Sequence, residues 1–189
     1  MKQKARIRVE GIKPILIQAF PIQALSEKNS RGGEEVWQNT VTMDQNRQLY
    51  IPGINFKNSI AAGGKEIKQG RGSIFKKVES TLEVEETKIL FEDLFVPEEQ
   101  NLLKLDTEPV YLDVRAVVNP TTKGRNIRYR IAARPGWRCS FHITWDDYLC
   151  SKEQIKMCAE NAGAFQGVGD GRKIGFGRYK ILSYEIIKN

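Results

Sequence analysis

The sequence has few of the residues that crosslink small proteins. Cysteine occurs only three times in 189 residues, at Cys139, Cys150 and Cys158. Three is an odd number, and a chain of this length can bury a core without covalent crosslinks. We therefore expect free thiols in a reducing compartment rather than a disulfide framework.

Long apolar runs are also lacking. No stretch approaches the roughly 18 apolar residues that a membrane-spanning helix needs. The first residues, Met1 to Arg6, are predicted to open a strand rather than a signal peptide. No basic amphipathic helix is present that would bind a membrane surface. These absences predict a globular protein with a cytoplasmic location and no membrane partner.

Acidic residues are missing from one window. Between Val114 and Trp145 there is no aspartate or glutamate, and the bases there are Arg115, Lys123, Arg125, Arg128, Arg130, Arg134 and Arg138. The preceding stretch, Glu79 to Asp113, carries eleven acids and only two bases. The whole chain has 30 Lys and Arg against 23 Asp and Glu, a net charge of +7. A concentrated basic surface attracts polyanions, so nucleic acid is the leading partner class.

Hydrophobic periodicity predicts a single α+β domain over residues 1–189, with two insertions. A polar loop is expected at about 25–48 and an acidic insertion at about 78–108. The remaining order of strand, helix, strand, strand, helix, strand predicts a ferredoxin-like (RRM-like) βαββαβ core with an antiparallel sheet. The elements are an opening strand or hairpin in Lys4–Glu10 and Pro14–Phe20, a helix in Ile54–Lys68, a hairpin of Val110–Val118 with Arg125–Ala133, a strand in Trp137–Trp145, a helix in Ser151–Ala164 and a closing strand in Phe176–Ile187.

Two segments combine basic side chains with a geometry suited to phosphate. Five glycines between Gly167 and Gly177 leave the backbone free to turn tightly and to offer N–H groups to an anion. In Arg125–Ala133, Arg128 and Arg130 fall on one face of a strand and Ile127, Tyr129 and Ile131 on the other. The alternatives are a strained turn and a solvated strand face. The residues expected to contact nucleic acid are Lys57, Arg125, Arg128, Arg130, Gly169, Gly171, Arg172, Lys173 and Arg178.

Two motifs resemble those of a known family. The run Tyr50-Ile51-Pro52-Gly53-Ile54-Asn55-Phe56-Lys57-Asn58-Ser59-Ile60 is similar to the signature that opens the first helix in the RAMP superfamily of CRISPR proteins. The glycine-rich segment resembles that superfamily's loop before the last strand. Lys57 is retained, whereas Ile54, Asn55, Phe56 and Asn58 depart from the usual pattern. The resemblance implies a backbone subunit of a type III-like effector complex in antiviral defense, in a short, stand-alone or mobile-element version.

Catalytic candidates are sparse. Type III backbone subunits cut RNA with an aspartate in a front loop, and the comparable stretch here offers Glu34, Glu35 and Asp44. Other RAMP proteins process RNA with a histidine, which implicates His142. The alternatives are a solvated polar loop and a structural histidine. Cys139 and His142 would point to opposite faces of a strand, so no zinc site is expected. We expect no metal and no cofactor, and no phosphate-binding loop of the nucleotide-triphosphate type is present.

Three functions remain open from the sequence. The first is binding of single-stranded RNA or DNA along its backbone without catalysis. The second is an endoribonuclease that uses Glu34, Glu35, Asp44 or His142. The third is a protein that imitates a backbone subunit and joins or inhibits an effector complex, with other effector subunits or copies of itself as partners.

Overall fold

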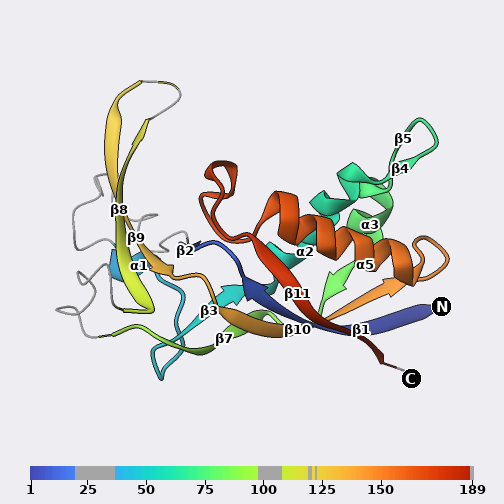
Figure 1. Cartoon of the computed structure of the whole chain (residues 1–189), viewed down its shortest axis with the longest axis horizontal. Helices are drawn as coiled ribbons and strands as arrows, with labels where there is room; N and C mark the ends of the chain where they lie inside the picture. The colour runs from blue at the N-terminus through green and yellow to red at the C-terminus, as the bar shows by residue number, and fades with distance from the viewer. Residues whose placement is uncertain (20–36, 98–107, 119–120, 122, 188–189) are drawn as a thin grey trace.

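The structure is a computed structural model that describes residues 1–19, 37–97, 108–118, 121 and 123–187 (Figure 1). Its helices are α1 (Trp37–Thr40), α2 (Gly53–Gly63), η3 (Gly64–Glu66), α3 (Phe75–Thr81), α5 (Lys152–Asn161), the π-helix η4 (Ala162–Gln166) and η5 (Arg172–Ile174). Its strands are β1 (Lys2–Gly11), β2 (Ile15–Ile17), β3 (Gln48–Pro52), β4 (Lys68–Gln69), β5 (Gly72–Ser73), β6 (Glu83–Val84), β7 (Lys88–Phe95), β8 (Val110–Val118), β9 (Arg125–Ala133), β10 (Arg138–Asp146) and β11 (Tyr179–Ile187).

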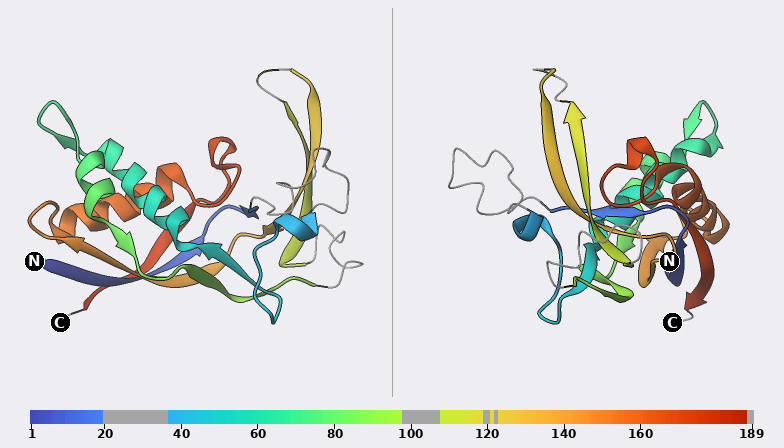
Figure 2. Two further views of the ribbon diagram at one scale, coloured as in Figure 1. Left: turned by 180° about the vertical axis from the view of Figure 1, so that it is seen from behind. Right: turned by 60° about the vertical axis from the view of Figure 1, so that its left-hand side comes forward.

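The main layer is an antiparallel sheet in the order β11-β1-β10-β7-β3, with β6 also paired to β10. Helices α2, α3 and α5 cover one face of this sheet, and among the described residues the other face is left open (Figures 1 and 2). The expected α+β class with antiparallel pairing is confirmed. No helix in the described part of the chain is long and apolar enough to cross a membrane.

A second, smaller sheet projects from the first. It has the order β2-β9-β8, and β8 and β9 form a long hairpin that stands away from the helical layer (Figure 2). The sequence predicts an opening strand or a hairpin in Lys4–Glu10 and Pro14–Phe20. The strand is confirmed as β1, and the hairpin is wrong. Strand β1 pairs with β10 and β11, whereas β2 pairs with β9. The turn between β1 and β2 therefore carries the chain from one sheet to the other.

The core lies between the main sheet and its helices, and aromatic rings connect its parts. Phe56 of α2 packs on Phe141 of β10, with ring centroids 4.3 Å apart, and on Tyr179 of β11. Trp137 contacts both Phe91 and Tyr179 edge-on. These five side chains are buried. They fix α2 and the start of β11, the strand that directly follows the glycine-rich segment.

Several element ends differ from the sequence-based expectation. Helix α2 ends at Gly63 rather than near Lys68, at a pair of glycines with low helix propensity, and η3 follows directly. Gly63 also lies close to α5, since a side chain there would lie 2.1 Å from the Cys158 carbonyl. Strand β11 begins at Tyr179 rather than Phe176. Helix α5 begins where expected, with Ser151 and Gln154 forming a reciprocal capping box. The acidic stretch from Val78 contributes the end of α3 together with β6 and β7.

Candidate nucleic-acid interface

The glycine loop, residues 167–178, is fastened to the strand that enters the small sheet. The N–H of Asp170 donates to the Leu16 carbonyl at 2.9 Å, and the N–H of Gly177 donates to the Pro14 carbonyl at 2.7 Å. The loop also closes on itself, since Val168 donates to the Gly177 carbonyl at 3.0 Å. These contacts hold the loop as a defined structure between the projecting hairpin and the helices (Figure 1).

The backbone at two of its glycines requires the absence of a side chain. Gly169 and Gly171 have φ of 81° and 68°, and a Cβ at Gly169 would lie 2.7 Å from the Leu16 carbonyl. Most backbone N–H groups of the loop already donate hydrogen bonds within the protein, however. Gly171 donates to Asp170 Oδ1 at 2.8 Å, and Ile174 and Phe176 donate to the Gly171 carbonyl. An incoming phosphate would therefore meet mainly the exposed side chains of Arg172 and Lys173.

Helix α2 is joined to the loop by a buried hydrogen bond. The Ser59 hydroxyl donates to the Gly167 carbonyl at 2.7 Å. The two sequence motifs, which are more than 100 residues apart, are thus in direct contact. Lys57, two residues earlier, points elsewhere and pairs with Glu83 of β6 at 2.9 Å. Its ammonium already has a partner in the folded chain.

The arginine face of the hairpin is joined to the loop by an ion pair. Nη1 of Arg130 lies 2.7 Å from Oδ2 of Asp170. The Arg130 side chain is only 5% exposed, and its Nε has no hydrogen-bond partner among the described residues. A buried guanidinium needs a close anion to offset its lost hydration. Asp170 supplies that anion and fixes the loop to β9.

A second contact between hairpin and loop reinforces the first. The Arg115 guanidinium of β8 lies 4.6 Å from the ring centroid of Phe176 in the loop. The same guanidinium is paired with the buried Asp113 carboxylate at 2.7 Å. Leu16, Ala132 and Phe176 form a small apolar cluster beneath these charges. The loop, β2 and the hairpin therefore pack as one unit.

The strand register separates the hairpin arginines by face. Arg128 lies on the Arg130 side of β9 and is directly opposite Arg115 of β8. It is exposed, and no carboxylate pairs with it in the described part of the chain. Arg125 is also exposed, but the alternation of side chains in a strand places it on the opposite face, with Ile127 and Tyr129.

Arg178 occupies a less open position than Arg172 and Lys173. Its side chain is half-buried, and Nη1 is buried without a hydrogen-bond partner among the described residues. Its backbone carbonyl accepts bonds from the N–H groups of Ile12 and Lys13. The residue therefore helps to hold the turn after β1. The structure thus brings together the glycine loop, Arg128 and Arg130, and places Lys57 and Arg125 apart from them.

The catalytic candidates have structural partners where they are described. Oδ1 of Asp44 accepts the N–H groups of Asn46 and Gln48, each at 2.9 Å, which closes a tight turn. His142 lies on the open face of the sheet, with Nδ1 2.6 Å from Oε1 of Glu86. The same carboxylate accepts the His142 N–H, where β10 lacks a neighbouring strand carbonyl. Glu34 and Glu35 lie outside the described residues.

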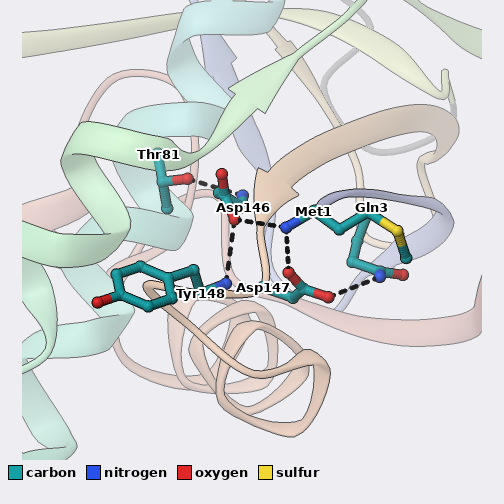
Figure 3. A network of polar contacts seen from close by, with 6 residues as sticks. All are labelled: Met1, Gln3, Thr81, Asp146, Asp147 and Tyr148. Atoms are coloured by element: carbon teal, nitrogen blue, oxygen red, sulfur yellow. Dashed lines mark hydrogen bonds and ion pairs between the residues drawn. The ribbon is translucent and has the colours of Figure 1, made fainter.

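One further polar cluster lies at the start of β1, away from the loop (Figure 3). The Met1 amino group is 3.0 Å from the Asp146 carboxylate and 2.5 Å from the Asp147 carboxylate. The N–H of Tyr148 and the Met1 ammonium keep the pKa of Asp146 below its usual value.

Within the described ranges, no group of His, Cys, Asp and Glu side chains has the arrangement of a metal site. Burial also raises the pKa of the Cys158 thiol to about 12.

No protein-family model matches the sequence, and no curated protein is significantly similar to it. Solved structures are similar in fold. A chain of the type III-B Cmr-beta complex bound to cognate target RNA matches 99% of this chain at 13% identity, with a TM-score of 0.58. This chain spans only 61% of that one. Cmr6 from Pyrococcus furiosus matches 96% of this chain and 98% of its own length, at 9% identity and a TM-score of 0.51. The chain therefore has a RAMP-like fold, as the resemblance implied.

Three residues that organise this interface are not evident from the sequence. Asp170 is one of several polar residues in the loop, and its partner is 40 positions away. Ser59 lies within the signature, but nothing in the sequence indicates that it contacts the loop. Arg115 was noted only for its charge, although its place opposite Arg128 follows once the hairpin register is known.

Proposed function

We propose that this chain binds single-stranded nucleic acid, with RNA as the preferred form, along its sugar–phosphate backbone as a CRISPR RAMP-type protein. The ion pair between Arg130 and Asp170 is the observation that carries the proposal. It sets the arginine face of the hairpin against the glycine loop. Arg128, Arg172 and Lys173 then remain exposed around the junction, with no carboxylate partner among the described residues.

Unpaired guanidinium and ammonium groups on a fixed scaffold neutralise phosphates and carry little sequence information. Each phosphate contact to a single strand contributes about −0.7 to the slope of log affinity against log salt. The three exposed bases would therefore give a slope of about −2. The residues that we assign to the contact are these three, with Arg130, Arg178, Gly169 and Gly171 shaping the surface. Arg125, on the other face of β9, and Lys57, paired with Glu83, are not part of the proposed contact.

The fold comparisons support this assignment without testing it. One similar structure is described as bound to cognate target RNA. We also assign the core to the ferredoxin-like class, because β1, α2, β7, β10, α5 and β11 follow the order of a βαββαβ unit. Similarity to effector-complex subunits makes other effector subunits or further copies of this chain the expected protein partners.

Fluorescence anisotropy with labelled single-stranded RNA tests the proposal. The double variant Arg128→Glu with Arg172→Glu should bind at least about tenfold more weakly and with a flatter salt dependence. Lys152→Glu with Lys156→Glu is the charge-matched control, because both lysines are exposed on α5 and the pair makes the same change of charge. Equal weakening by the control and the double variant would show that only net charge matters, and the assignment would be lost.

A further inference from the structure

A second basic surface lies at the end of the helical layer that is farthest from the β8–β9 hairpin (Figures 1 and 2). It consists of η3, the short hairpin of β4 and β5, and the start of α3. Five exposed bases lie on it: Lys65, Lys68, Arg71, Lys76 and Lys77. The only acid between residues 65 and 77 is Glu66. We call this surface the β4–β5 patch.

The bases of the β4–β5 patch differ in their pairing from four bases on the open face of the main sheet. On the open face of the main sheet, Lys4, Arg8, Arg138 and Lys180 each have a carboxylate oxygen within 2.7 Å. No described carboxylate lies within 4.0 Å of any base in the patch. Like charges that are left unpaired repel one another and attract an external polyanion. The patch is therefore suited to bind phosphates.

The tip of the patch is narrow. Lys68 pairs with Ser73 and Gln69 with Gly72, so Gly70 and Arg71 form the turn and Arg71 stands at its tip. Apart from the adjoining residues, no described atom lies within 4 Å of where a side chain would begin at Gly70 or Gly72. The major groove of B-form DNA admits a two-stranded β-ribbon, and arginine side chains enter narrow minor grooves.

The patch lacks the aromatic surface that single strands use. Proteins that bind single-stranded nucleic acid stack its bases on exposed aromatic rings. Phe75 is the aromatic residue of this segment, and it is partly buried against the core with Lys65 4.9 Å above its ring. A double helix presents phosphates without free base faces, so the patch matches a duplex better than a single strand.

We propose that the β4–β5 patch is a site for double-stranded nucleic acid, with its bases on backbone phosphates and Arg71 in a groove. It is separate from the interface at the glycine loop and requires neither the loop arginines nor the β8–β9 hairpin. DNA and RNA duplexes both present the backbone phosphates that the patch would bind. The test therefore uses a B-form DNA duplex and an A-form RNA duplex of the same sequence.

The test compares Lys68→Gln with Arg71→Gln against a control that loses the same charge, Lys2→Gln with Arg6→Gln. Lys2 and Arg6 are exposed on β1 and have no carboxylate partner in the described part of the chain. All four positions are on the surface, and thermal unfolding checks that the variants fold. Binding to a DNA duplex, an RNA duplex and single-stranded RNA is measured by anisotropy over a range of salt concentrations.

We expect the patch variant to bind at least one duplex about fivefold or more weakly, with a salt slope reduced in magnitude by about 2. Single-strand affinity should stay within about twofold of wild type, and the control should match wild type with every ligand. If the patch variant loses affinity for the DNA duplex alone, the contact is to a groove of B-form DNA. If it loses affinity for both duplexes, the contact is to the backbone phosphates that they share. An unchanged duplex affinity, or an equal loss on the single strand, would overturn the proposal. Neither result depends on the glycine-loop variants, which test the proposed function separately.

Discussion

Arg130 and Asp170 form the contact that joins the β8–β9 hairpin to the glycine loop. Their side chains meet at 2.7 Å, and the arginine is buried while the aspartate is 41% exposed. Asp170 has a second task, since its other oxygen accepts the Gly171 N–H at 2.8 Å. A single carboxylate thus neutralises Arg130 of the hairpin and shapes the loop. Because this contact joins the two segments, it also sets the position of the exposed Arg128 on the hairpin relative to Arg172 and Lys173 on the loop.

Asp170→Ala should lower the free energy of unfolding by about 1–3 kcal/mol, because the buried Arg130 would lose its counter-charge. Partial exposure of the aspartate keeps the loss below that of a fully buried pair. Urea unfolding measures the change. Glu83→Ala removes the partner of Lys57, but Glu83 is 58% exposed, so the loss there should stay below about 1 kcal/mol. A larger loss at Glu83 than at Asp170 would contradict the role given to the buried pair.

Gly169→Ala should destabilise the protein by about 2 kcal/mol or more, since it combines a strained φ with a clash against the Leu16 carbonyl. Gly136→Ala is the matched control. Gly136 also has positive φ, at 96°, but apart from the adjoining residues no described atom lies within 4 Å of the added methyl group. Gly136→Ala should lower the free energy of unfolding by about 1 kcal/mol. Equal losses in thermal or urea unfolding would show that the loop does not press against β2.

Glu10 should make stability depend on pH in the acidic range. Hydrogen bonds from Lys180 and Arg138 lower the pKa of its carboxyl from 4.5. The charged form is favoured in the folded state, so the stabilisation is complete above pH 4.5 and disappears as the pH falls through the lowered pKa. NMR titration of the Glu10 carboxyl should show the lowered value, and Lys180→Gln should raise it. No change in Lys180→Gln would exclude this pairing in solution.

Single-stranded RNA should remain intact when incubated with the protein and magnesium. The Asp44 carboxylate accepts two backbone N–H groups of its own turn, and Nδ1 of His142 is hydrogen-bonded to Glu86. Both candidates therefore have structural partners. Gel analysis of end-labelled RNA is the measurement. The panel includes Glu34→Ala, Glu35→Ala, Asp44→Ala and His142→Ala. Cleavage by the wild type that disappears in one of these variants would establish the endoribonuclease alternative instead.

Local patterns in the sequence predicted much of the fold. The hairpin of Val110–Val118 and Arg125–Ala133 agrees with β8 and β9, because period-two alternation and the turn residues between them are local signals. The same holds for the cap at Ser151. Helix α2 ends early at Gly63-Gly64, and a glycine pair is a local signal for a helix end. The close approach of Gly63 to the Cys158 carbonyl joins segments far apart in the chain, and no local pattern predicts it.

The candidate site divides in the same way. Charge and glycine content identified the loop and the β9 arginines, whereas the contacts that join them are non-local. Arg125 is an instructive exception, because the alternation already placed it with Ile127 rather than with Arg128. The pairing of Lys57 with Glu83 could not be foreseen, since it depends on where β6 lies beside α2. The β4–β5 patch had a visible signal in Gly70-Arg71-Gly72, which predicts a basic turn.

Hydrogen–deuterium exchange with and without single-stranded RNA tests the central claim most directly. The account predicts slower exchange at residues 125–130 of β9 and 167–178 of the glycine loop when RNA is bound. The open face of the main sheet, reported by residues 4–8 of β1 and 140–144 of β10, should show no change. Protection confined to that open face, with the glycine loop and the hairpin unaffected, would contradict the account.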